Sequence, residues 1–294
     1  MCCLLITLSA CTVFSPGAEV VTPTPMPTSS VEGYQVISSQ ACQIAQQGMI
    51  RVEHPQGDLI SWSPLADTVA YIASTLNSSW NVGNLNILSA PSFDTPGRIA
   101  TQAAGELTWS PDGTSIAYLG LRLSDNIYTI GLAYPDGRAS MDLFPGEAAR
   151  TDGFASQKAI LEWSGASRLR VLTSCGVNCF QGLDFSIPDG LSAPTGDTSE
   201  RSWDLWSVHT HQPTQIPPAY ADLTGQLNWS PDELRIAYID GNGYVWIVNV
   251  ETDTLYPLDI GAYSTATETD WSFDSHYLAV HVDQSLKIFS FECP

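Results

Sequence analysis

Leu107-Thr108-Trp109-Ser110-Pro111-Asp112-Gly113-Thr114-Ser115-Ile116-Ala117-Tyr118 is the stretch of sequence that decides the fold. An apolar run ends on Trp-Ser, and Pro-Asp-Gly then supplies the residue types that tight turns favour. A second apolar run follows at once. Two such runs on either side of a turn predict a β-hairpin.

The same pattern occurs five times along the chain. The other copies of the first run are Ile60-Ser61-Trp62-Ser63-Pro64, Leu161-Glu162-Trp163-Ser164, Leu227-Asn228-Trp229-Ser230-Pro231-Asp232 and Thr269-Asp270-Trp271-Ser272-Phe273-Asp274. Second runs lie at 69–71, 116–118, 170–172, 236–238 and 278–280, and third runs at 85–87, 127–130, 205–208, 245–248 and 286–288. Because apolar residues alternate in the third runs, we expect strands and not helices.

The spacing of the repeated tryptophans indicates the architecture. Consecutive copies lie 47, 54, 66 and 42 residues apart, at Trp62, Trp109, Trp163, Trp229 and Trp271. A four-stranded blade of a β-propeller takes about 40 to 50 residues. The value of 66 indicates an insertion in the third unit.

These repeats resemble the WD40-like repeat of TolB and its relatives, whose mark is Trp-Ser-Pro-Asp-Gly followed by an apolar-Ala-Tyr strand. The resemblance runs from Leu59 to the end of the chain. It implies an all-β propeller of four-stranded blades, with five blades expected and six as the alternative. The last unit has only three strands, so the strand at Gly48–Glu53 should complete the last blade and leave no open sheet edge.

The N-terminal residues predict an exported lipoprotein. Leu4-Leu5-Ile6-Thr7-Leu8 is apolar but too short to span a bilayer. Leu8-Ser9-Ala10-Cys11 resembles the lipobox of bacterial lipoproteins, whose Cys carries the lipid after cleavage, although no Lys or Arg precedes the apolar run. We expect a signal peptide at 1–10, a lipidated Cys11 on a tether rich in Pro, Thr and Ser at 11–33, and a propeller domain at 34–294. The resulting location is the bacterial cell envelope, outside the cytoplasm and anchored to the membrane.

Four cysteines lie in the predicted domain: Cys42, Cys175, Cys179 and Cys293. An even number in an exported protein predicts disulfides. Cys42 and Cys293 lie at the two ends of the expected ring, and a bond between them would fasten its closure. Cys175 and Cys179 would close a small loop, and their spacing does not match a zinc site.

Composition and motifs indicate binding and not catalysis. The formal charge of −20 repels phosphate backbones, so nucleic acid is a poor partner, whereas a protein or a carbohydrate is plausible. The sequence has no nucleophile elbow, zinc-protease motif, phosphate-binding loop or dinucleotide fingerprint. We expect no cofactor and no metal. The alternative is an extracytoplasmic glycoside hydrolase, in which two carboxylates face one another across the propeller channel.

The third unit holds the predicted recognition element. Its third run starts at Leu205, 42 residues after Trp163, whereas the same interval is 15 to 23 residues in the other units. The added segment is acidic and rich in turn residues, with Phe180, Asp184, Phe185 and Asp189 as candidate binding residues. Long surface loops on a rigid scaffold are often functional, but an insertion without a role is equally compatible with this pattern.

Overall fold

The computed structural model of the protein describes residues 35–36, 43–52, 60–74, 82–124, 127–143, 159–176, 179–187, 190–195 and 226–292. Contacts between residues divide the chain between Tyr34 and Gln35, and every described residue belongs to the second part. The described residues form strands and turns without a helix. Among them, accordingly, no helix is long and apolar enough to cross a membrane.

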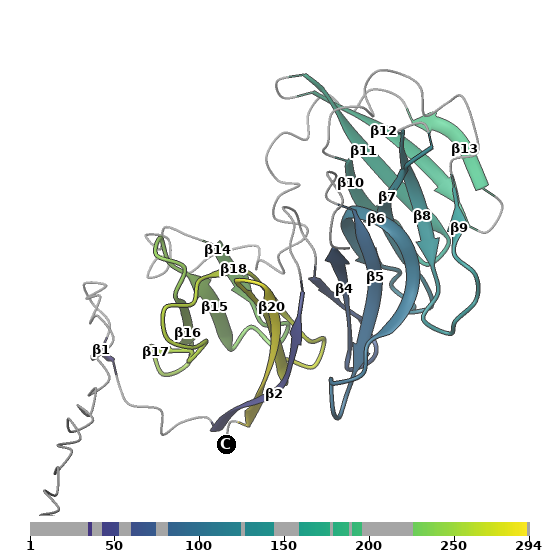
Figure 1. The fold of residues 1–294 in the computed structure, drawn as a ribbon. Coiled ribbons are helices and arrows are strands. Elements are labelled where there is room, and N and C mark those ends of the chain that lie inside the picture. The colour runs from purple at the N-terminus through teal and green to yellow at the C-terminus, as the bar shows by residue number, and fades with distance from the viewer. Residues whose placement is uncertain are drawn as a thin grey trace, which may run out of the picture. The chain divides into compact units, whose positions relative to one another are not determined.

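The strands form four sheets (Figure 1). The largest contains, in chain order, β3 (Ile60–Trp62), β4 (Thr68–Ser74), β5 (Gly83–Ser89), β6 (Gly97–Trp109), β7 (Ile116–Arg122), β8 (Ile127–Ala133) and β9 (Met141–Asp142). The second contains β10 (Ala159–Trp163), β11 (Arg168–Gly176), β12 (Cys179–Ser186) and β13 (Gly190–Thr195). The third contains β14 (Gln226–Trp229), β15 (Arg235–Ile239), β16 (Val245–Asn249) and β17 (Thr254–Pro257), with the short β1 (Gln35–Val36) parallel to β17. The fourth contains β18 (Ala266–Trp271), β19 (Tyr277–Val282), β20 (Ser285–Glu292) and β2 (Gln43–Arg51).

The predicted hairpins are confirmed in all five units. Each Trp ends the first strand of its unit, and the second apolar run forms the antiparallel neighbour of that strand. The predicted third strands are also confirmed in four units, as β5, β8, β16 and β20. β2 is the neighbour of β20, with Gln43 opposite Glu292 and Arg51 opposite Ser285, so it supplies a fourth strand to the last unit.

The seven-stranded sheet contains two units that share β6. Residues 97–103 of this strand pair with β5, and residues 103–109 pair with β7. The register shifts at Gly105, and Gln102, Gly105 and Glu106 have φ values of 60°, 143° and 36°. Bulges of this kind bend a strand. One long strand therefore ends the first unit and begins the second without a loop.

The third unit corrects the sequence-based prediction. Its third strand is β12 and its fourth strand is β13, both antiparallel to their neighbours. The segment 180–200 was predicted to be an inserted loop, which is wrong for residues 180–186 and 190–195 because they are strands. The predicted strand at 205–208 lies outside the described residues. The long segment of the third unit therefore follows the fourth strand, whereas it was predicted to precede the third strand.

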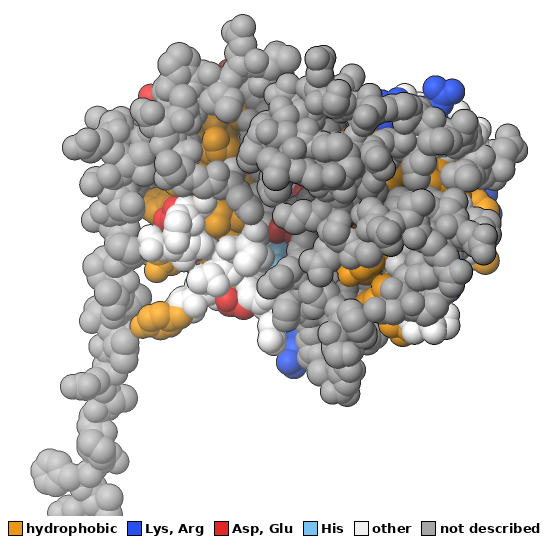
Figure 2. Space-filling view, turned by 90° about the horizontal axis from the view of Figure 1, so that it is seen from above, with side chains coloured by type: hydrophobic (Ala, Val, Ile, Leu, Met, Phe, Trp, Pro, Cys, Tyr) orange, Lys and Arg blue, Asp and Glu red, His pale blue; other side chains and the backbone are white. Residues whose placement is uncertain are grey.

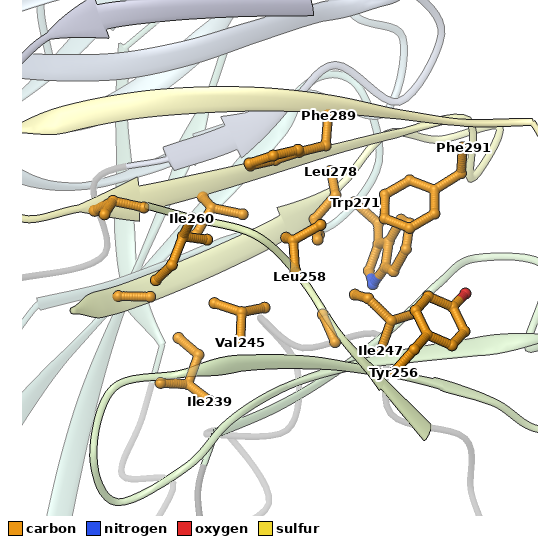
Figure 3. Close-up of a cluster of buried hydrophobic side chains, with 14 residues drawn as sticks. Ile239, Val245, Ile247, Tyr256, Leu258, Ile260, Trp271, Leu278, Phe289 and Phe291 are labelled. Atoms are coloured by element: carbon orange, nitrogen blue, oxygen red, sulfur yellow. The ribbon is translucent and has the colours of Figure 1, made fainter. Parts of the chain in front are cut away.

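Hydrophobic clusters lie between the units, one unit against the next. Figure 3 shows the cluster between the last two, in which Trp271, Leu278, Phe289 and Phe291 face Ile239, Val245, Ile247 and Tyr256. Three further clusters join the last unit to the first, the first to the second and the second to the third. Because two of these clusters cover both faces of the second unit, its strand β7 is apolar on both faces and buried from Ile116 to Leu121.

Candidate binding surface

The repeated tryptophans connect the units through one recurring hydrogen bond. In each described case the indole N–H donates to the main-chain carbonyl of the residue just before the Trp of a neighbouring unit. These bonds run from Trp109 to Ser61 (2.9 Å), from Trp163 to Thr108 (3.2 Å), from Trp271 to Asn228 (3.0 Å) and from Trp62 to Asp270 (2.9 Å). We call this set the tryptophan ladder. It holds the first strands of all five units in one orientation.

The bond of Trp62 joins the first unit to the last. Two further bonds support this junction: the Trp62 main-chain N–H donates to Asp270 Oδ2 (3.0 Å), and that of Ile60 donates to Glu268 Oε1 (3.2 Å). β3 is an edge strand of its sheet, and its main-chain donors thus find acceptors in the last unit. The ring of Trp62 also stacks on Tyr277 of the last unit, with centroids 6.0 Å apart and an angle of 11°.

Because the first strands share one orientation, the turn after each Trp lies at the same end of its sheet. The antiparallel order brings the turn between third and fourth strands to that end as well. We define the turn face as residues 63–67, 90–96, 110–115, 134–140, 164–167, 230–234, 250–253 and 272–276. Contacts between neighbouring turns agree with this placement: the Asp232 N–H donates to Ser275 Oγ (3.0 Å), and a Cβ on Gly113 would lie 3.6 Å from the Cβ of Leu65.

A small hydrogen-bond network shapes these turns. Ser110 Oγ donates to Asp112 Oδ1 (2.6 Å), the Thr114 N–H donates to the same oxygen (3.1 Å), and the Ser115 N–H donates to Ser110 Oγ (3.0 Å). The pairs Ser230 with Asp232 and Ser272 with Asp274 repeat the arrangement. The hydrogen bond from Ser110, with those from Thr114, holds the pKa of Asp112 below its ordinary value. The Ser-x-Asp motif is therefore a structural element of the turns, and in the second unit it keeps the Asp112 carboxylate charged.

Three turns present apolar side chains to solvent. Leu65 takes the place of the Asp in the first unit and is 62% exposed, Phe273 takes the place of the Pro in the last unit and is 42% exposed, and Leu234 is 43% exposed. The turns of the first and last units are neighbours, because Asp274 and His276 both act on the pKa of Asp67, which burial raises, Asp274 raises further and His276 lowers. The exposed apolar groups therefore lie on three consecutive turns.

The turn face is acidic. Its nine carboxylates belong to Asp67, Asp94, Asp112, Asp136, Asp232, Glu233, Glu251, Asp253 and Asp274, whereas Arg138 is its single Arg or Lys. Arg138 bonds to Asp136 at 2.7 Å. On the part of the molecule seen in Figure 2, described Asp and Glu side chains appear at several separate places, and described Lys and Arg side chains at others.

Two of the four binding residues predicted in the third unit are buried. Phe185 is fully buried among Leu161, Leu169 and Val171, and Asp184 is 7% exposed and bonds to Arg170 at 2.9 Å. Phe180 lies in β12 opposite Ser174. Asp189 lies outside the described residues, so it stays a prediction. The turn face was missed because its signal is small: one Leu and one Phe at positions where most of the other repeats carry Asp and Pro.

The predicted modification sites are placed only in part. Cys175 lies in β11 and Cys179 in β12, on either side of the connection between the two strands, and Cys179 is opposite Gly176. Cys11, Cys42 and Cys293 lie outside the described residues. Within the described ranges, no group of three or more His, Cys, Asp or Glu side chains could hold a metal ion.

Comparisons with known proteins identify the fold. No known protein family matches the sequence, and no curated protein is significantly similar to it. The WD40 domain of Pan2 from Neurospora crassa superposes with a TM-score of 0.52 at 10% identity, over 87% of this chain and 97% of that domain. TolB from Acinetobacter baumannii gives a TM-score of only 0.35 at 11% identity, over 84% of this chain and 55% of TolB. At 10% identity the likeness to the Pan2 domain concerns the fold alone, and the chain therefore has the WD40-like propeller fold.

Proposed function

We propose that this protein is a lipid-anchored, extracytoplasmic propeller that binds a protein partner and has no catalytic activity. The observation that carries the proposal is the turn face, where a rigid scaffold presents exposed apolar side chains on consecutive turns. Exposed apolar side chains gathered on one face of a protein are typical of interaction sites. A carbohydrate ligand is supported less well, since the described residues of the turn face present no Trp.

We infer further that the propeller has five blades. The tryptophan ladder links the five tryptophans in the order third, second, first, last and fourth unit, so each described neighbour follows the chain order except at the first-to-last junction. With β6 counted in two blades and β2 in the last, all five units have four strands. A sixth blade would have to come from residues outside the described ranges.

The alternative of a glycoside hydrolase finds less support. A catalytic pair needs two carboxylates that are free to reach the substrate. Glu268 and Asp270 lie on the first strand of the last unit, but both accept main-chain hydrogen bonds from β3. Their role among the described residues is to join two units.

Replacing Cys11 with Ser is expected to release the protein from the membrane. The reason is that Leu8-Ser9-Ala10-Cys11 resembles a lipobox, and without a thiol no lipid can be attached. The measurement is the distribution of the protein between membrane and soluble fractions of the cells that produce it. Replacing Cys175 with Ser is the control and should leave the distribution unchanged. Equal membrane binding of the Cys11→Ser protein would contradict the anchor.

Site-specific photo-cross-linking tests the binding function in intact cells. A photoreactive residue at Leu65, on the turn face, is expected to give a covalent adduct with another protein. The same residue at Leu123, which is 53% exposed at the other end of its sheet, should give none. Absence of protein adducts at Leu65 and Phe273, in cells where the protein is anchored, would overturn the proposed function.

A further inference from the structure

The turn face combines three features that together describe a ligand class. Leu65, Phe273 and Leu234 offer apolar contact, and the same face carries nine carboxylates. Several of these carboxylates are held in the charged form: the hydrogen bonds of Ser110 and Thr114 lower the pKa of Asp112, and those of Ser92 and Thr95 lower the pKa of Asp94. At neutral pH the face is therefore both negative and apolar.

Few cations lie on or beside the described turn face to balance this charge, although Arg168, the first residue after the turn of the third unit, is exposed. Arg138 is engaged by Asp136. Arg235, the first residue after the fourth turn, is 8% exposed, bonds to Asp232 at 2.8 Å and lies over the rings of Trp271 and Phe291. Its charge is used inside the fold to hold two units together. The nine carboxylates of the face outnumber these cations, so a ligand with positive groups would complement it.

We propose that the turn face binds a protein segment rich in Lys and Arg that also carries exposed apolar side chains; this rests on the proposed binding function. The positive groups would lie against the carboxylates, and the apolar groups against Leu65 and Phe273. A second copy of this chain is a poor occupant, because two such faces would bring like charges together. Nucleic acid and anionic lipid are repelled by the same carboxylates.

Fluorescence anisotropy with three labelled 12-residue peptides tests this assignment on the purified full-length protein. The first peptide contains Lys and Leu, in the second Ser replaces each Leu, and in the third Glu replaces each Lys. We expect binding in the order Lys and Leu, then Lys and Ser, with no binding of the Glu peptide. Because the attraction is between exposed charges, about 0.5 M salt should weaken it strongly relative to about 0.05 M.

Matched variants locate the binding. The double variant Leu65→Ser with Phe273→Ser should lose about tenfold in affinity for the Lys and Leu peptide, a change of about 1.4 kcal/mol, and little for the Lys and Ser peptide. The double variant Glu233→Gln with Glu251→Gln should lower the affinity for both cationic peptides. Leu123→Ser and Asp259→Asn, which change an exposed apolar and an exposed acidic residue elsewhere, are the controls and should bind like the parent protein.

Two results would overturn the assignment. One is equal binding of both cationic peptides to the parent and to all variants, since the attraction would then be a property of the general acidity. The other is a cross-linked partner at Leu65 whose attached segment is neutral or acidic. In that case the proposed binding function stands and only the ligand class is wrong. If no adduct forms and no peptide binds, the proposed binding function and the ligand class are both wrong.

Discussion

Replacing Trp62 with Ala is expected to lower the free energy of unfolding by about 3 to 5 kcal/mol, the range for truncation of a buried Trp. Trp62 is 6% exposed, stacks on Tyr277 and lies edge-on to Phe93 at 5.9 Å. Its indole N–H and main-chain N–H both bond to Asp270 of the last unit. The side chain therefore supports the junction between the first and last units as well as the core.

Replacing Trp62 with Phe separates the contribution of ring packing from that of the indole hydrogen bond. Trp62→Phe keeps an aromatic ring but removes the N–H, so we expect a smaller loss of about 1 to 2 kcal/mol, the cost of leaving a buried carbonyl without its donor. Trp109→Ala is the matched control, because Trp109 is 7% exposed and bonds to Ser61 within the seven-stranded sheet. Urea unfolding followed by fluorescence measures all three. If Trp109→Ala costs 3 to 5 kcal/mol and Trp62→Ala costs no more than a surface substitution, Trp62 does not join the first unit to the last as described.

The hairpins were predictable because their signal is local. Pro111, Asp112 and Gly113 specify a turn through their own backbone preferences and hydrogen bonds, so neighbouring residues suffice to identify it. The third strand of the third unit was not predictable in this way. Asp184 interrupts an apolar strand, and a charged residue there predicts an exposed position. Its cross-strand neighbour Arg170, however, bonds to it and makes its burial possible. The pairing lies 14 residues apart and is visible only once the register is known.

The tryptophan ladder shows a second limit of sequence-based prediction. A Trp at the same strand position in every unit predicts a core residue, and burial confirms this for Trp62, Trp109, Trp229 and Trp271. The sequence does not reveal that the indole N–H reaches the neighbouring unit, since its acceptor is a main-chain carbonyl common to all residue types. The turn face likewise became visible only when the ladder placed the five turns at one end.

The proposed Cys42–Cys293 disulfide is expected to have the other large effect. Both residues lie outside the described ranges, but their neighbours Gln43 and Glu292 are opposite each other in the pair formed by β2 and β20. Antiparallel register continued by one residue would bring Cys42 opposite Cys293. Such a bond closes a loop of about 250 residues, which stabilises the fold by about 5 kcal/mol in the chain-entropy model.

Changing both Cys42 and Cys293 to Ser should therefore lower the free energy of unfolding by up to about 5 kcal/mol. Changing both Cys175 and Cys179 to Ser is the control, since a bond there would close a loop of only a few residues and contribute about 2 kcal/mol in the same model. Urea unfolding with and without reductant measures both. Reductant should destabilise the parent protein and the control by about 5 kcal/mol or more, but the Cys42→Ser, Cys293→Ser protein by no more than the roughly 2 kcal/mol of the small loop. Free thiols at both positions in non-reducing peptide maps of the secreted protein would show instead that the pairing of β2 with β20 and the tryptophan ladder hold the first and last units together without a covalent bond.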